Sequence, residues 1–257
     1  MFFPYRDDNP TERTAVVTIF FIVLNVLIWV FFQRMGFNEA AMANALCNWG
    51  LIPGEITGRS IGHAVPITRR FMCVVDPESS WFTLISMQFL HGSWMHLVGN
   101  MLFLWIFGNN VEDAMGRVRF IVFYLLCGIL AGVAQIVSDP SSPIPAVGAS
   151  GAVSGVLGAY LILFPRARVW MVVWIFIFIR QVALPAWIYL LVWIGLQVAS
   201  GMADMQARAA GHPGGGVAFW AHVGGFLAGV VMVHAFVDSS YMRRHRVREH
   251  IMRMRGL

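Results

Sequence analysis

Four polar residues of this sequence interrupt or border long apolar stretches, and their types are those of a hydrolytic site. They are His96, Asn100, Ser150 and His222. Polar side chains are costly inside an apolar helix and are therefore candidates for function. A serine hydroxyl becomes a nucleophile when a neighbouring histidine takes its proton. His96 and Asn100 are four residues apart, so they share one helical face and can donate hydrogen bonds to the oxyanion that forms.

The segments around these residues have the composition of a membrane protein. Of the 257 residues, 58% are hydrophobic and only 12% are charged, whereas a soluble domain carries roughly 25% charged residues. The mean hydropathy is +0.68. We therefore expect an all-α integral membrane protein. The net charge of +5 comes from arginines in connections and tails, which indicates contact with lipid headgroups and argues against nucleic acid as a partner.

Six apolar runs are candidates for membrane-spanning helices, since about 20 residues cross the hydrocarbon core of a bilayer. They cover residues 15–33, 93–110, 119–137, 147–164, 185–200 and 217–237. For 15–33 a retained helix is favoured over a cleaved signal peptide, whose apolar core runs only about 7–15 residues. The predicted organisation is a six-helix domain at 15–237 with a long outer loop at 36–90. Tails at 1–14 and 238–257 flank this domain.

Two connections between these runs are too long or too apolar to be simple turns. The apolar segment 169–179 is too short to span, and we expect it to be interfacial or re-entrant. The glycine-rich connection at 201–216 is either a mobile lid or an ordinary flexible linker.

The arginines predict the orientation of these spans. The segments expected inside carry Arg6, Arg13, Arg117, Arg119, Arg166, Arg168 and the basic C-terminal tail. The outer connection at 138–146 has no basic residue, and the one at 201–216 has only Arg208. This positive-inside pattern predicts that both termini are cytoplasmic. The exclusive use of arginine suggests the inner, plasma membrane of a bacterium. The four polar residues then lie at similar depth, near the outer ends of the second, fourth and sixth spans.

Small residues indicate that the fourth and sixth spans pack closely. Stripes of this kind let helix backbones approach in lipid. The two stripes are Gly151, Gly155 and Gly158 in the fourth span, and Ala221, Gly225 and Gly229 in the sixth. His222 shares its helical face with the second stripe, and Ser150 precedes the first. We therefore expect Ser150 and His222 to meet.

The strings HGSWMHLVGN (91–100), GASG (148–151) and AHVGG (221–225) each open an even-numbered span. In that order they resemble the rhomboid intramembrane serine proteases, over roughly residues 81–237. The resemblance implies a six-transmembrane-helix rhomboid-like bundle that cleaves transmembrane protein substrates without cofactor or metal. It implies that Ser150 attacks the scissile carbonyl and that His222 is the base. The remaining implied roles are an oxyanion hole of His96, Asn100 and the Ser150 amide, and structural positions at His91, Gly148, Gly151 and Gly225.

Some features depart from the family pattern. Ser154 stands where some members carry an aromatic residue under the histidine ring, so the group that orients His222 stays open. Trp81 is followed by Phe82, where some members have a Trp-Arg pair.

The alternative functions are an inactive rhomboid-like adaptor or chaperone and, as a weaker one, a transporter. Cys127 is expected to be a small buried hydrophobe. Cys47 and Cys73 either pair or stay free, and the oligomeric state is open.

Overall fold

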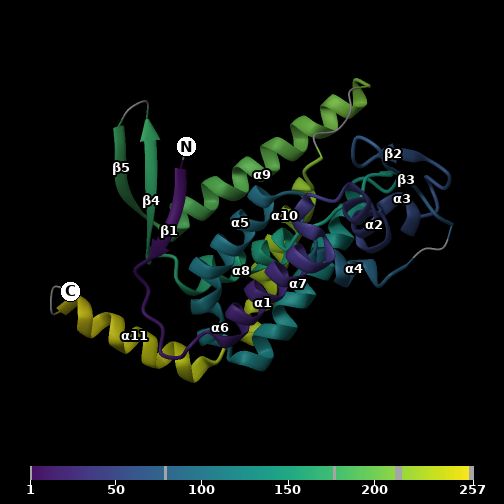
Figure 1. Ribbon diagram of the computed structural model, residues 1–257. Coiled ribbons are helices and arrows are strands. Elements are labelled where there is room, and N and C mark those ends of the chain that lie inside the picture. The colour runs from purple at the N-terminus through teal and green to yellow at the C-terminus, as the bar shows by residue number, and fades with distance from the viewer. Residues whose placement is uncertain (1, 78–79, 176–177, 212–215, 255–257) are drawn as a thin grey trace.

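The protein is a bundle of helices, and each predicted apolar run forms one (Figure 1). The computed structural model describes residues 2–77, 80–175, 178–211 and 216–254. The helices of the bundle are α1 (Val16–Leu27) with its continuation η1 (Ile28–Phe32), α5 (Trp94–Phe103) with η4 (Leu104–Gly108) and α6 (Asn109–Met115), α7 (Arg117–Ser138), α8 (Ser150–Leu163), α9 (Ala186–Ala209) and α10 (Phe219–Phe236).

Three of these helices, α7, α9 and α10, are long and apolar enough to cross a membrane, among the residues that the structure describes. The α1–η1 segment and α8 are apolar but shorter. Fourteen residues at 1.5 Å each make α8 about 21 Å long. Residues 151–160 of α8 are all buried by the surrounding protein, so this helix does not have to match the thickness of a lipid layer.

Glycines set the distance between α8 and α10. A β-carbon at Gly225 would overlap the carbonyl oxygen of Gly151, and one at Gly229 would overlap that of Gly155. Both pairs advance by four residues in the same direction, so α8 and α10 run parallel. The close packing predicted from the small-residue stripes is therefore confirmed. Cys127 of α7 is buried against Gly155, as expected for a small hydrophobe.

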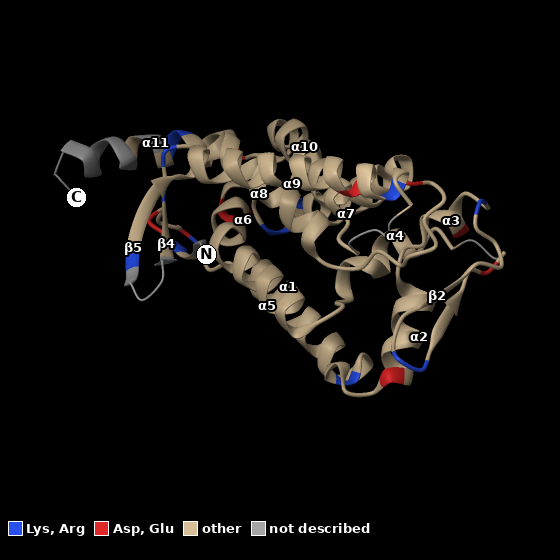
Figure 2. Ribbon diagram, turned by 90° about the horizontal axis from the view of Figure 1, so that it is seen from above, with Lys and Arg blue, Asp and Glu red and all other residues tan. Residues whose placement is uncertain are grey.

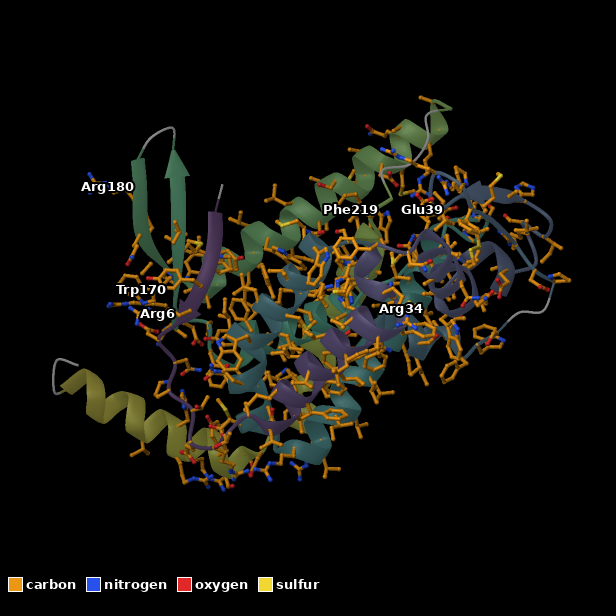
Figure 3. All side chains as sticks on the ribbon, in the orientation of Figure 1. Arg6, Arg34, Glu39, Trp170, Arg180 and Phe219 are labelled. Carbon is orange, nitrogen blue, oxygen red and sulfur yellow. A yellow bond between two sulfur atoms is a disulfide. The ribbon has the colours of Figure 1, made fainter. Side chains whose placement is uncertain are left out.

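A three-stranded antiparallel sheet corrects the all-α prediction to a mostly helical fold. Its strands are β1 (Phe2–Asp7), β4 (Arg168–Ile175) and β5 (Phe178–Pro185), in the order β1-β4-β5. The segment expected to be interfacial or re-entrant thus lies in a hairpin, apart from residues 176–177, which lie outside the described residues. Its β-branched and aromatic residues favour strands, and buried Val169 and Met171 flank half-buried Trp170 with the alternation of a strand. The Arg6 guanidinium lies 5.0 Å from the Trp170 ring (Figure 3).

The predicted outer loop is a folded segment. It contains η2 (Arg34–Gly36), α2 (Glu39–Trp49), α3 (Pro53–Ile56), the hairpin of β2 (Ala64–Pro66) and β3 (Met72–Val74), α4 (Thr83–Ser86) and η3 (Met87–Phe89). A disulfide joins Cys47 of α2 to Cys73 of β3, with 5.6 Å between their Cα atoms. Leu51 and Ala146 form a β-bridge, which ties this segment to the connection before α8.

The connections of the bundle gather at two opposite ends (Figures 1 and 2). The sheet and α11 (Ser239–Met254) lie at one end, and the segment from α2 to α4 lies at the other. The charged residues concentrate at these ends, while the bundle helices are uncharged over most of their length (Figure 2).

At the sheet end, the buried Glu112 carboxylate accepts hydrogen bonds from the amides of Val17 (3.0 Å) and Thr18 (2.7 Å). Glu112 therefore caps the start of α1.

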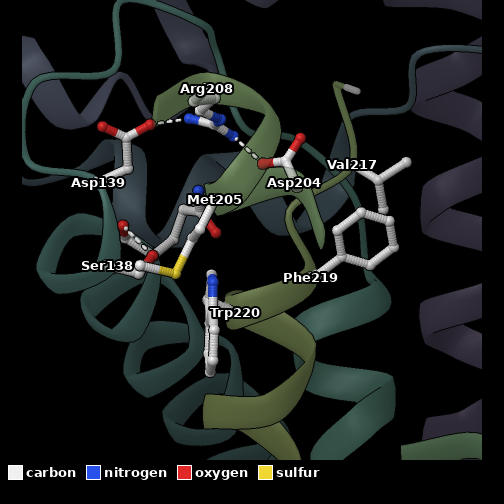
Figure 4. Close-up of a pocket in the computed structure, with 9 residues that line it drawn as sticks. Ser138, Asp139, Asp204, Met205, Arg208, Val217, Phe219 and Trp220 are labelled. Carbon is white, nitrogen blue, oxygen red and sulfur yellow. Dashed lines mark hydrogen bonds and ion pairs between the residues drawn. The ribbon is translucent and has the colours of Figure 1, made fainter. Parts of the chain in front are cut away.

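Helix α9 extends beyond the predicted end of its span at residue 200. At its far end Arg208 forms ion pairs with Asp139, after α7, and with Asp204, one turn earlier (Figure 4). These side chains border a small hollow of about 180 Å³ above Trp220. Most of the predicted 201–216 connection is therefore helix, and its residues 212–215 lie outside the described residues.

Candidate active site

A cavity of about 700 Å³ opens between α5, α8, α9 and α10. The four predicted chemical side chains, His96, Asn100, Ser150 and His222, all line it. They come from three different helices, each near its first residues. The cavity lies toward the end of the bundle that carries the α2–α4 segment, because Leu46, Pro66 and Ile67 of that segment also line it.

Helix α5 presents two donors to this cavity. Ser93 caps the helix, accepting the His96 amide hydrogen at 3.1 Å. The His96 Nδ1 accepts the Gly92 amide hydrogen at 3.5 Å, so Nε2 is the ring nitrogen that carries a hydrogen. Asn100, one turn further, is buried, and its amide nitrogen has no hydrogen-bond partner among the described residues. Both groups are thus available to an oxygen that enters the cavity.

Gly148 leaves open the space between His96 and Ser150. A β-carbon at this position would lie 2.6 Å from His96 Nε2 and 3.2 Å from Ser150 Oγ. The backbone φ of Gly148 is +131°, a conformation that glycine adopts far more readily than other residues. Its amide is held by the Met87 carbonyl at 2.9 Å. Glycine at position 148 therefore leaves a space that both the Nε2 donor of His96 and the Ser150 hydroxyl border.

The packing of α8 on α10 determines the level of Ser150 and His222. Gly225 lies against Gly151, and Gly229 lies against Gly155. His222 is three residues before Gly225 on the parallel helix α10, so it is level with the residues at the start of α8. Gly151 itself lies against α7, where a β-carbon would be 2.6 Å from that of Ala131. Over the described residues no hydrogen bond joins the Ser150 hydroxyl to the His222 ring; what they share is the wall of one cavity. Such bonds commonly tighten only when substrate binds.

The His222 ring has partners on α9 that the sequence interpretation missed. Its Nδ1 lies 2.8 Å from the Gln197 side-chain oxygen, and its ring centre lies 6.1 Å from that of Trp193. Gln197 is a strongly polar residue inside an apolar run, the same signal that singled out His96. Ser154 instead donates to the Ser150 carbonyl at 2.6 Å, within its own helix.

His91 is completely buried beside the site. The Gln33 side chain donates to the His91 carbonyl at 2.7 Å and accepts its amide hydrogen at 2.9 Å. Burial, and then the adjacent His96 ring 5.2 Å away, lower the pKa of His91 to about 3. The ring is therefore neutral near pH 7. Gln33 ends the first apolar run, so this clasp joins α1 to the segment that leads into α5.

The arrangement has the parts that acyl transfer requires: a hydroxyl, an imidazole and converging hydrogen-bond donors around one space. Carboxylates that act in catalysis would have to line the same cavity, and none of its described lining residues is Asp or Glu.

Comparison with known proteins points to one family. The sequence model of the Rhomboid domain matches residues 78–239. The Putative rhomboid protease YdcA of Bacillus subtilis is 27% identical over 151 residues, which are 59% of this chain and 64% of the relative. The Rhomboid protease GluP of the same bacterium is 42% identical over 84 residues, 33% of this chain and 16% of the relative.

A eukaryotic protein is similar over a longer stretch. Rhomboid protein 1, mitochondrial, of Saccharomyces cerevisiae is 31% identical over 160 residues, which are 61% of this chain and 42% of the relative. The chain thus spans less than two thirds of the length of each of these three relatives.

Proposed function

Because the chain belongs to the rhomboid family, with the Rhomboid domain matched over residues 78–239, we propose that it is an intramembrane serine endopeptidase. The observation that supports this most strongly is the convergence of Ser150, His222, His96 and Asn100 on one cavity. The two similar bacterial relatives are named as rhomboid proteases. The proposed substrates are transmembrane segments of other membrane proteins.

The proposed reaction begins with His222 taking the proton of the Ser150 hydroxyl. The serine oxygen attacks the scissile carbonyl carbon, and the carbonyl oxygen becomes an oxyanion. The His96 Nε2 hydrogen, the Asn100 amide and the Ser150 backbone amide are the proposed donors to that oxyanion. The protonated His222 then gives its proton to the leaving amine, and the Ser150 acyl ester remains. Water, deprotonated by His222, hydrolyses this ester and restores the hydroxyl.

A substrate helix must unwind before its carbonyl can react. Within a helix, each carbonyl is already engaged by a backbone amide, and bilayer hydrocarbon offers no replacement partner. The cavity is proposed to supply that replacement, since polar side chains such as His96, Asn100 and Gln197 line it. Segments with helix-breaking residues near the site are therefore the expected substrates.

The proposed topology has six crossings and cytoplasmic termini. It rests on the alternation of connections between the two ends of the bundle (Figure 2) and on arginines at the sheet end. Arg6 lies in β1, and Arg13 and Arg117 line one hollow with Glu112. A bacterial plasma membrane is the proposed location. In intact cells, a membrane-impermeant maleimide applied after reduction of the disulfide should label Cys47, which is only partly buried, whereas Cys73 is buried. Labelling only after the membrane is opened would reverse the topology.

The decisive experiment measures cleavage of a fluorogenic transmembrane peptide by the purified protein in detergent. Wild type should cleave the peptide and react with a fluorophosphonate probe, while Ser150→Ala and His222→Ala should lose the cleavage. Asn100→Leu removes a donor and should lower kcat by about 10²–10³. Undiminished cleavage by Ser150→Ala would end the serine-protease proposal. A folded wild type that neither cleaves nor reacts with the probe would favour an adaptor function.

A further inference from the structure

The His222 ring has a polar partner on α9. The Gln197 side-chain oxygen lies 2.8 Å from His222 Nδ1, and Gln197 is half-buried in the wall of the same cavity. An amide oxygen only accepts hydrogen bonds. The hydrogen of a neutral His222 therefore sits on Nδ1, and the lone pair that can accept a proton sits on Nε2.

The position of Gln197 is fixed by contacts on both sides of it along α9. One turn before it, the Trp193 ring lies 6.1 Å from the His222 ring and 6.2 Å from the Phe226 ring. One turn after it, Gly201 lies against Trp220, where a β-carbon would come within 3.2 Å of the indole. Residue numbers rise along α9 as they fall along α10. The two helices are therefore antiparallel, and Gln197 is level with His222.

Helix α8 offers His222 no comparable support. Ser154, one turn after Ser150, is buried, and its hydroxyl donates to the Ser150 carbonyl. Within the described part of the chain, the hydrogen-bond partner and the aromatic neighbour of the His222 ring, Gln197 and Trp193, both come from α9. The orientation of this imidazole is thus set by α9 side chains.

We propose that Gln197 is the positioning residue of the catalytic base, with the Trp193 ring packed beside the imidazole. This inference rests on the proposed Ser150–His222 mechanism. When Nε2 takes the Ser150 proton, the ring becomes an imidazolium with a hydrogen on each nitrogen. The Nδ1 hydrogen keeps its bond to the Gln197 oxygen, and that bond becomes charge-assisted. Nε2 then passes its proton to the leaving amine, and the ring returns to the starting tautomer.

The bond should therefore contribute more in the transition state than in the resting enzyme. An interaction that strengthens as the reaction proceeds raises kcat, whereas one that holds substrate alone changes KM. Gln197→Met removes the acceptor at nearly constant side-chain length, and Gln197→Glu keeps an acceptor oxygen. Gln206→Met is the matched control, because Gln206 is an exposed residue of the same helix.

The experiment compares these three variants with wild type and Ser150→Ala, using the fluorogenic peptide, the fluorophosphonate probe and thermal unfolding in detergent. Gln197→Met should lower kcat by about 10- to 100-fold with KM within about twofold, and should slow probe labelling similarly. Gln197→Glu should recover most of the lost kcat, and Gln206→Met should match wild type.

Two results would overturn the positioning role. Wild-type kcat in Gln197→Met is one, and a kcat for Gln197→Glu as low as that of a folded Gln197→Met is the other. If Gln197→Met unfolds, the kcat of Gln197→Glu is compared with that of Gln197→Asn instead. Asn is one methylene too short to reach Nδ1, so equal kcat in these two variants would also overturn the role. Full activity of Ser150→Ala would instead refute the mechanism on which the inference rests.

Discussion

Replacing Gly148 with alanine tests whether the space between His96 and Ser150 is where the reaction occurs. The new methyl group would lie 2.6 Å from His96 Nε2 and 3.2 Å from Ser150 Oγ. An ordinary contact needs about 3.4 Å, so the His96 ring must retreat by about 0.8 Å. The φ of +131° adds backbone strain of about 1–3 kcal/mol in a residue that carries a β-carbon.

The displaced ring should matter more to rate than to stability. A donor that moves by about 0.8 Å no longer reaches an oxyanion at hydrogen-bond distance, and losing one such donor costs about 10²–10³ in kcat. The methyl group also occupies the space that the oxyanion would take. We expect Gly148→Ala to lose at least 10²-fold in kcat, with a modest fall in Tm.

The control for backbone strain is Gly62→Ala. Gly62 also has a positive φ, +78°, but a β-carbon there would have no neighbour within 4 Å. Cleavage of the fluorogenic peptide and thermal unfolding are measured for both variants in the same detergent. Gly62→Ala should lose some Tm and keep its kcat. A folded Gly148→Ala with wild-type kcat would refute the assignment of this space to the oxyanion.

Three further predictions follow from buried contacts elsewhere in the bundle. Glu112→Ala leaves the two amides at the start of α1 without their acceptor. At about 1–3 kcal/mol for each amide, Tm should fall by roughly 4–24 °C, and an unchanged Tm would contradict the capping role. Burial raises the pKa of Asp7 from 3.8 to about 6, against the opposing hydrogen bond from Tyr160. The folded state therefore favours the protonated carboxyl, and the stabilisation is full below about pH 4 and lost as pH rises through about 6. Wild-type Tm should rise between pH 7 and 5 relative to that of Asp7→Asn, and parallel pH curves would disprove this. Gly225→Ala forces α10 away from the Gly151 carbonyl and should lower both Tm and kcat, whereas Gly195→Ala, with open space around it, should change neither.

The positions of the bundle helices could be predicted because each is a long, mostly apolar run with few polar residues. The predicted runs 119–137 and 217–237 agree with α7 and α10 to within about two residues at each end. The sheet was missed because the length of 169–179 excludes a spanning helix but does not choose among the shorter structures. The strand structure of this segment is stabilised by pairing with Phe2–Asp7, which lies about 160 residues away in the chain.

The polar residues of the site were found because charge and hydrogen-bonding capacity are rare in apolar helices. Gln197 meets the same criterion in the apolar run 185–200, but it lies outside the three strings that resemble the family. Pairing of Cys47 with Cys73 depends on the fold of the α2–β3 segment, so spacing alone left it open. The Gln33 clasp on His91 likewise joins residues 58 positions apart, and no local pattern indicates it.

The site is assembled by two kinds of contact, and they should respond differently to mutation. Backbone on backbone fixes α8 against α10, since Gly225 meets the carbonyl of Gly151. A substitution there moves a whole helix, so stability and rate must change together. Helix α9 reaches the base through side chains alone, chiefly Gln197 and Trp193. Removing one of those contacts leaves the backbone in place, so rate can fall while the fold persists. A separation of kcat from Tm at Gln197, and its absence at Gly225, follows from this difference in how the two helices are held.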